Sequence, residues 1–303
     1  MLQTYQPKRA AMSQSFSIRH GTYRVWRWNA DALATPERPL LVLTHGWMDV
    51  GASFQFMVDA MVSTRPIVAI DWRGFGQTSM PPTDSYWFPD YLGDLDALLD
   101  ALSPDASVDL LGHSMGGNVV MSYAGARSER LRKLINLEGF GLPATRPQDA
   151  AKRLRSWLDE LRSPATLRDY DDCQGVAERL VKNNPRLTPD RAAWLAQHWA
   201  EPRSDGRWHI QGDPAHKHVN PMLYRRDEIV ETWREIRCPL LWVEGAQTDV
   251  TKWWGNRYPR ADFDDRLAVV KLVTRHTLAD CGHMLHLDQP QALAAVIESY
   301  LDS

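Results

Sequence analysis

The chain of 303 residues has only three cysteines, Cys173, Cys238 and Cys281, and no pair of them has CxxC spacing. Few, odd-numbered and widely separated cysteines argue against a disulfide framework or a zinc site, and they fit a reducing compartment. No apolar run approaches the ~20 residues that cross a bilayer, and no apolar stretch follows the basic residues near the N-terminus. These absences predict a soluble, cytoplasmic protein without stable membrane association.

The sequence also lacks a surplus of positive charge, because 35 basic residues face 38 acidic ones and the net charge is -3. Phosphate backbones require a basic surplus, so we expect no nucleic-acid partner. The sequence has no P-loop, no GxGxxG after a strand and no HExxH, and we therefore expect no cofactor and no metal. His216 and His218 have the spacing of a metal pair, but a surface or structural role is the preferred interpretation.

Short apolar runs make up much of the rest of the chain, in six segments: 39–44, 65–70, 108–111, 131–137, 239–243 and 268–278. Runs of this length without alternation are typical of strands buried on both faces, as in a parallel sheet. Helical patterns separate most of them, and alternation over 16–28 predicts a hairpin. The pattern predicts an α/β fold with a mostly parallel central sheet flanked by helices.

The strand pattern stops between Phe140 and about Arg234, where helical segments, prolines and five tryptophans occur instead. We interpret residues 141–234 as a helical cap inserted into a core made of residues 15–140 and 235–303. Residues 1–14 are polar and without pattern, which predicts a flexible tail. Met12 offers a second possible start, so the status of residues 1–11 stays open.

The strongest chemical signal is the segment Gly112-His113-Ser114-Met115-Gly116-Gly117, which follows an apolar run and opens a helical pattern. A tight strand-to-helix turn of this kind strains the serine backbone and exposes its hydroxyl group. The glycines around Ser114 remove Cβ atoms that would clash, and the helix N-terminus favours negative charge nearby. We therefore predict that Ser114 is a nucleophile.

Four motifs in this order resemble the α/β-hydrolase superfamily: His45-Gly46-Trp47, residues 71–78, residues 112–117 and residues 281–290. The resemblance spans about residue 16 to 301 and implies an α/β-hydrolase fold with an inserted helical cap. Residues 137–141 and 213–217 resemble the serine-hydrolase-like group within it, of esterase or lipase type.

The resemblance implies that His283 is the catalytic base, on the loop between the last strand and the final helix. Loops at this edge of an open α/β sheet hold ligand sites, and Ser114 lies at the same edge. His286 is expected to pack near the final helix, His113 to lie under the serine turn, and His45 to brace a neighbouring loop. The segment around Asp71 and Arg73 is expected to tie loops together without a chemical role.

Two carboxylates compete to orient the histidine. Asp249 follows the strand predicted over 239–243, where the family usually places its acid. Glu138 follows the preceding strand, where some members of the family keep theirs. The resemblance favours Asp249, with Glu138 as the alternative.

Two backbone N–H groups are expected to form an oxyanion hole: that of Met115, directly after the nucleophile, and that of Trp47, after the His45-Gly46 turn. The side chain of Trp47 is expected to project towards the substrate. Phe140 and the cap residue Trp157 are the other predicted substrate-binding residues, and core packing is the alternative for Phe140.

A serine at the elbow, where related enzymes of other chemistry carry a carboxylate, predicts acyl transfer to water through an acyl-enzyme. The expected substrate is a small-molecule carboxylic ester, thioester or lactone of small to medium size. Two alternatives stay open: perhydrolase or C–C hydrolase activity on the same triad, and a non-enzymatic ligand receptor with a degenerate hydrolase site. The oligomeric state is not predicted.

Overall fold

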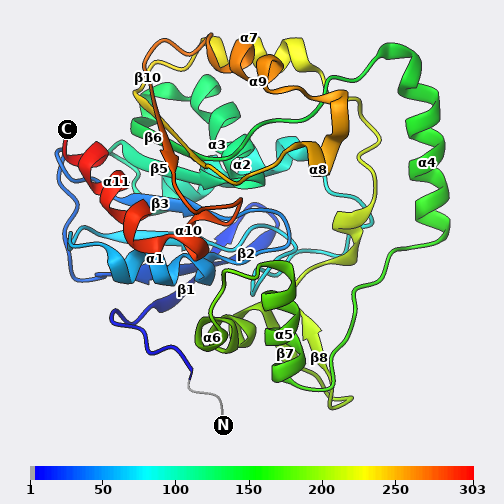
Figure 1. The fold of residues 1–303 in the computed structure, drawn as a ribbon, viewed down its shortest axis with the longest axis horizontal. Helices are drawn as coiled ribbons and strands as arrows, with labels where there is room; N and C mark the ends of the chain where they lie inside the picture. The colour runs from blue at the N-terminus through cyan, green and yellow to red at the C-terminus, as the bar shows by residue number, and fades with distance from the viewer. Residues whose placement is uncertain (1–3) are drawn as a thin grey trace.

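The computed structural model describes residues 4–303 (Figure 1). Its main sheet has eight strands in the order β1-β2-β4-β3-β5-β6-β9-β10. The strands are β1 (Met12–Ile18), β2 (Gly21–Trp28), β3 (Leu41–Thr44), β4 (Ile67–Ile70), β5 (Val108–His113), β6 (Leu131–Leu137), β9 (Leu240–Gly245) and β10 (Val273–Leu278). From β4 to β10 every neighbouring pair is parallel, and only the β1–β2 hairpin introduces antiparallel pairing. The predicted mostly parallel sheet is confirmed.

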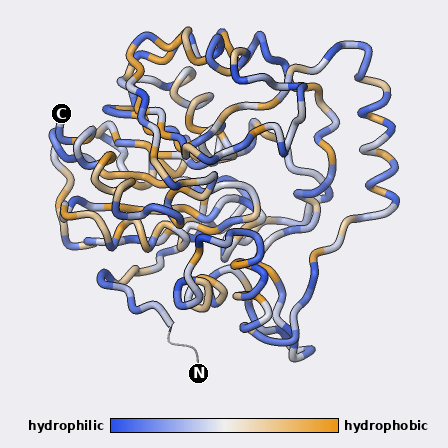
Figure 2. The backbone as a smooth tube through the Cα atoms, viewed as in Figure 1, coloured by the Kyte–Doolittle hydropathy of each residue, from blue (hydrophilic) through white to orange (hydrophobic). Residues whose placement is uncertain are grey.

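Helices cover both faces of the sheet because its central strands are apolar on both sides. In β3, Leu41 and Leu43 belong to one core cluster and Val42 to the other, as alternation along a strand requires. The first cluster includes α1 (Gln55–Ala60), α10 (Leu285–Asp288) and α11 (Pro290–Asp302). The second includes α2 (Phe88–Leu102), α3 (Met115–Ala126), α7 (Arg226–Arg234) and α9 (Arg260–Leu267). Figure 2 shows the apolar residues concentrated along the strands between these two layers.

The apolar run over 268–278 differs from its prediction as a buried strand. Only Val273–Leu278 forms a strand, and most of its residues are exposed because β10 is the edge of the sheet. The connection from β9 contains two helices that were not predicted, α8 (Thr251–Trp254) and α9. Short 3-10 helices complete the described chain: η1 (Gly51–Phe54), η2 (Ser128–Arg130), η3 (Pro147–Asp149), η4 (Pro214–Lys217) and η5 (Gly255–Arg257).

The N-terminal segment is docked on the core where a flexible tail was expected. Residues 1–3 lie outside the described residues. The Asp59 carboxylate accepts hydrogen bonds from the Tyr5 hydroxyl at 2.8 Å and from the Arg9 backbone N–H at 2.8 Å. The Arg9 guanidinium donates to the carbonyls of Met61 and Ser63. The tail prediction is therefore wrong for residues 4–14, because a buried carboxylate in α1 organises this segment and β1 begins at Met12.

The insertion contains α4 (Ala150–Arg162), α5 (Cys173–Asn183) and α6 (Pro189–Trp199), close to the predicted helices. A small antiparallel pair, β7 (Ala200–Pro202) and β8 (Trp208–Ile210), was not predicted. Helices α5 and α6 pack into the first core cluster, whereas α4 has no buried residue and lies at the edge of the molecule (Figure 1). Helix α7 packs against α3 and therefore belongs to the second helical layer. The inserted segment that adds to the common sheet and its two helical layers thus ends before Arg226.

Across residues 4–303, no helix combines the length with the apolar character needed to cross a membrane.

Candidate active site

Ser114 occupies the predicted strand-turn-helix position, between the end of β5 and the start of α3. Its φ of 52° and ψ of -113° lie in a strained region for a residue with a side chain. A Cβ on Gly112 would lie 2.4 Å from the Gly116 carbonyl oxygen, and one on Gly116 would lie 2.5 Å from that of Thr44. The glycines therefore permit the close approach of strand and helix that presents the serine hydroxyl.

His283 lies beside Ser114, as predicted, with its Nε2 atom 2.9 Å from the serine Oγ. Its Nδ1 atom lies 2.6 Å from the Oε2 atom of Glu138. The other oxygen of Glu138 accepts the backbone N–H of Gly245 at 2.7 Å. The Glu138 side chain is fully buried, whereas the His283 ring is 23% exposed. The imidazole thus bridges a buried carboxylate and an accessible hydroxyl.

The register of two neighbouring strands places Glu138 opposite the nucleophile. In the parallel β5–β6 pair, His113 is level with Leu137, and the Ser114 backbone N–H donates to the Leu137 carbonyl at 2.8 Å. Ser114 and Glu138 are the residues that follow these partners, and both have a positive φ, 52° and 56°. The apolar run of β6 ends directly before Glu138, but that of β5 ends at Leu111, three residues before Ser114, so the runs alone do not reveal this match.

Asp249, the preferred acid in the sequence, does not contact His283, and the prediction is wrong about the histidine's partner. Its carboxylate is exposed and accepts hydrogen bonds from the backbone N–H and the hydroxyl of Thr251, at 3.0 and 2.5 Å. These bonds lower the pKa of Asp249 and cap the start of α8. Strand β9 ends at Gly245, whose N–H donates to Glu138. After this residue the chain turns, and Asp249 lies away from the histidine.

The loop after β3 and the start of α3 carry the two predicted oxyanion donors. Met115 is the first residue of α3, so its N–H has no acceptor within the helix. The N–H of Trp47 has no backbone acceptor among residues 4–303. His45 braces this loop, as expected: its Nε2 atom accepts the Trp72 N–H at 2.9 Å, and its Nδ1 atom lies 2.7 Å from the Gly46 oxygen.

Comparison with known proteins agrees with the fold. Residues 39–290 match the family model described as the alpha/beta hydrolase fold. The chain belongs to the α/β hydrolase fold family. Among its relatives are a serine hydrolase-like protein of Danio rerio, 25% identical over 87% of this chain and 81% of the relative, and esterase YbfF of Escherichia coli (strain K12), 23% identical over 86% and 92%. The thioesterase domain from the curacin biosynthetic pathway superposes with a TM-score of 0.81 at 24% identity, covering 96% of this chain and 99% of that domain.

In this α/β hydrolase, the insertion holds the Trp47 loop from two sides. The indole N–H of Trp199, at the end of α6, donates to the Met48 carbonyl at 2.9 Å. The indole N–H of Trp47 donates to the His216 carbonyl in η4 at 3.3 Å. Met48 has a φ of 54°, so the loop takes a strained turn between these two attachments. The insertion therefore contributes to the position of a predicted oxyanion donor.

The three predicted substrate-binding residues lie in different surroundings. Trp47 is 51% exposed on its loop. Phe140 is buried and packs edge-on against Trp242 and Phe263, in agreement with the core-packing alternative. Trp157 of α4 donates its indole N–H to the Ser85 hydroxyl at 3.0 Å.

One exposed aromatic residue next to the site was missed in the sequence. The Trp253 ring of α8 meets the His283 ring edge-to-face, with 4.5 Å between centroids. Only the unpredicted helix between β9 and β10 brings this side chain to the site. No spacing in the sequence signals it.

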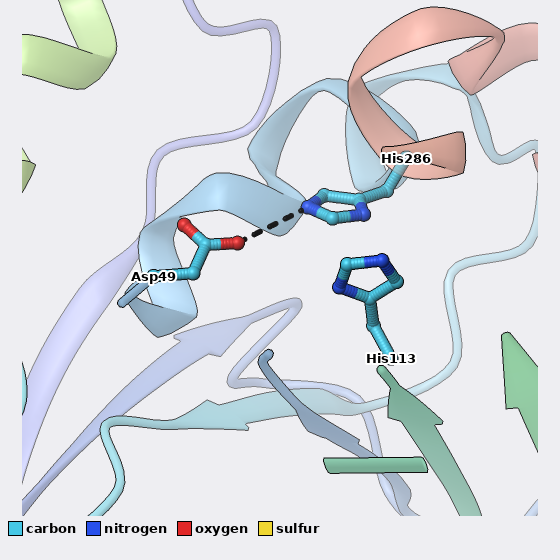
Figure 3. A group of neighbouring side chains, drawn as sticks. All are labelled: Asp49, His113 and His286. Carbon is cyan, nitrogen blue, oxygen red and sulfur yellow. Dashed lines mark ion pairs between the residues drawn. The ribbon is translucent and has the colours of Figure 1, made fainter. Parts of the chain in front are cut away.

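Three other buried side chains form a group that could in principle hold a metal: Asp49, His113 and His286 (Figure 3). One ligand atom from each lies within 4.8 Å of the others. His286 is buried at α10, near the final helix as expected, and His113 lies under the serine turn as expected. The Asp71 carboxylate accepts from Gly51, Gln77 and Trp26, in agreement with its predicted structural role.

Proposed function

We propose that this protein is a serine hydrolase that cleaves small to medium carboxylic esters, thioesters or lactones through an acyl-enzyme. The observation that carries the proposal is the unbroken line from the Ser114 hydroxyl through the His283 ring to the Glu138 carboxylate, at 2.9 and 2.6 Å. Two relatives named as an esterase and as a serine hydrolase-like protein support the reaction class. Ser114 is the nucleophile, His283 the base and Glu138 the acid of the proposed triad.

In the acylation step, the Ser114 oxygen attacks the carbonyl carbon while His283 Nε2 takes the hydroxyl proton. The carbonyl π electrons move onto oxygen, and the N–H groups of Met115 and Trp47 stabilise that charge. Each donor of this kind is typically worth roughly 10²–10³ in rate. Glu138 accepts the Nδ1–H of His283 and stabilises the imidazolium that forms. When the tetrahedral intermediate collapses, the bond to the leaving group breaks and Nε2 gives that group its proton.

In the second step, His283 takes a proton from water, and the resulting hydroxide oxygen attacks the acyl carbon. Collapse of this intermediate breaks the bond to Ser114 and returns the proton to the serine oxygen. The products are the free acid and the restored enzyme, so the cycle needs no cofactor.

Two exposed tryptophans favour an apolar acyl group. Trp47 lies on the loop with a proposed oxyanion donor, and Trp253 is 42% exposed against the His283 ring. Aromatic rings in these places provide apolar surface next to the reacting atoms, as in most small-molecule sites. We therefore propose an acyl pocket that is mostly apolar and bordered by tryptophan.

A panel of p-nitrophenyl esters of increasing acyl length tests the proposal, together with labelling by a fluorophosphonate followed by intact mass. We expect repeated turnover, a preferred chain length, and a single label on Ser114. Labelling with no second turnover would support a receptor and contradict the proposed activity. Absence of both turnover and label would contradict the assignment of the nucleophile.

A further inference from the structure

We infer that His113 is a positioning residue that fixes the backbone of His283, and that Asp49 and His286 hold His113 in place (Figure 3). The inference rests on the proposed function, because it concerns the histidine that moves the proton. His113 Nε2 lies 2.8 Å from the carbonyl oxygen of His283. The residue before the proposed nucleophile therefore binds the main chain of the proposed base, although their sequence positions differ by 170.

The tautomer of His113 follows from this contact. A carbonyl oxygen only accepts, so the proton of the neutral ring lies on Nε2. Nδ1 is then a bare acceptor, and it is buried without a hydrogen-bond partner in the described structure. Burial, and then the neighbouring His286 and His283 rings, lower the pKa of His113 well below its ordinary value. The ring stays neutral, so the positive charge formed during the reaction belongs to His283 alone.

A second contact attaches the same segment of chain at His286, three residues after His283. His286 Nε2 lies 3.2 Å from the Ser53 hydroxyl oxygen and 3.4 Å from Asp49 Oδ2. Asp49 is itself fixed, because it accepts from the Ser53 hydroxyl at 3.0 Å and from the Val50 N–H at 2.9 Å. The loop of the base is thus attached to β5 through the His283 carbonyl and to η1 through the His286 side chain.

The imidazole rings of His283, His113 and His286 pack in a row, so the position of each ring depends on the next. The centroid of His113 lies 4.9 Å from that of His283 and 4.7 Å from that of His286. Asp49, His113 and His286 are all at most 5% exposed. A closely packed interior resists small rotations, so a displaced His113 would move the His283 backbone. His283 must reach Ser114 and Glu138 at the same time, and a small rotation would break one of these contacts.

The same atoms suit a metal less well. Zinc binds nitrogen at ~2.0–2.1 Å, and ligand atoms up to 4.8 Å apart would have to move inwards around the ion. His286 Nε2 already faces Asp49 and Ser53, and none of the three residues opens to solvent. The contacts of His286 with Asp49 and Ser53 and the packing of the His113 ring on His286 therefore account for the arrangement. A bound metal is an outcome that the experiment detects.

Two amide substitutions separate positioning from packing. The amide nitrogen of His113→Gln can reach the place of Nε2 and donate to the His283 carbonyl, whereas that of His113→Asn ends near Nδ1 and cannot. We expect His113→Asn to lower kcat by about 10²-fold with little change in KM, the size expected for a misplaced catalytic group. His113→Gln should restore most of kcat. The rate of fluorophosphonate labelling should follow the same order, and thermal unfolding should confirm that both variants fold.

NMR titration of the His283 ring in histidine-labelled protein provides a readout that does not depend on turnover. His113→Asn should shift the Nδ1–H signal of His283, and His113→Gln should leave it near its wild-type position. If the wild type neither turns over nor labels, the proposed function fails, and the NMR comparison still decides the inference. Equal rates and equal NMR titrations in both variants would overturn the inference. One equivalent of metal in the purified wild type, lost in His286→Gln, would also overturn it.

Discussion

Residues 4–303 contain two serine–histidine–carboxylate groups, and they differ in how the partners are arranged around the ring. In the first, Ser114 meets Nε2 of His283 and Glu138 meets Nδ1. In the second, Ser53 and Asp49 both face Nε2 of His286, and Nδ1 has no partner in the described chain. The same kinds of functional group are therefore arranged in two ways. The His283 group can pass a proton between partners on opposite sides of the ring, and the His286 group cannot.

The direction of the serine hydrogen bond explains the difference further. Ser53 donates its proton directly to Asp49, so its oxygen gains no base. The second group is also closed to solvent, whereas the His283 ring is 23% exposed and Ser114 is partly exposed. Access and partners on opposite nitrogens, rather than composition, distinguish the proposed catalytic group from the buried one.

The largest contrast should come from the two serines. Ser114→Ala should lower ester hydrolysis by up to ~10⁶ in kcat, because it removes the atom that forms the acyl-enzyme. Ser53→Ala should keep most of the activity and lose stability instead. Steady-state kinetics and urea unfolding of both variants test this contrast. A Ser114→Ala variant that retains more than a few per cent of activity, with contamination excluded, would falsify the nucleophile.

The two acids that competed in the sequence form the next pair. Glu138→Gln should lower kcat by about 10⁴, the order seen when the triad acid of a serine protease loses its charge. Asp249→Asn should change kcat little, because its carboxylate only caps α8. The kcat values of the two variants at pH 7 provide the measurement. A crippled Asp249→Asn beside an active Glu138→Gln would mean that the loop after β9 rearranges during turnover.

Loss of the Asp49 charge should lower the free energy of unfolding. Burial alone would raise the pKa of Asp49, but hydrogen bonds from His286 and Val50 and the nearby imidazoles lower it overall. Asp49→Asn should reduce the free energy of unfolding by roughly 2–3 kcal/mol at pH 7.

The pH dependence of this loss follows from the lowered pKa. The unfolded carboxyl takes up a proton near pH ~4, while the folded one stays ionised, so its contribution is present above that pH and is lost on further acidification. The difference between wild type and Asp49→Asn in urea unfolding should therefore narrow below pH 4. A difference that is constant from pH 7 to pH 3 would contradict an ionised Asp49.

The smallest effect concerns His113, which stays neutral in the folded protein. The unfolded chain protonates this histidine below pH ~6.5, so unfolding takes up a proton and stability falls as the pH drops. One such group contributes a slope of up to about 1.4 kcal/mol per pH unit. His113→Gln should flatten the stability curve between pH 6.5 and 5 by up to that amount. An unchanged slope would show that His113 is protonated in the fold.

Features fixed by one continuous segment could be predicted from the sequence. The turn at Ser114 and the loop at His283 each follow a strand and precede a helix, so their place at one sheet edge follows from local order. The acid depends on how the chain bends after two different strands. The positive φ of Glu138 turns it into the site, and the capping of α8 turns Asp249 out. Neither bend is encoded in the apolar pattern.

The insertion is a second, larger region in which the sequence pattern predicts the elements but not their contacts. Its helical spacing predicts amphipathic helices but not the surface that covers each apolar face. Leu195 of α6 is buried against the core, whereas Leu154 and Leu158 of α4 are about half exposed, at 45% and 48%. The docked N-terminal segment was missed for a related reason, because its partner, Asp59, lies in α1, far along the chain.

The bonds from Trp199 to Met48 and from Trp47 to His216 have a consequence for how this enzyme could change. The inserted segment fixes the loop that carries a proposed oxyanion donor and Trp47, a proposed substrate-binding side chain. Exchanging residues 141–225 for the corresponding segment of a relative would therefore alter charge stabilisation as well as acyl preference. Selectivity and turnover are physically linked traits here, and a lineage that acquires a new substrate through this segment must re-establish its rate at the same time.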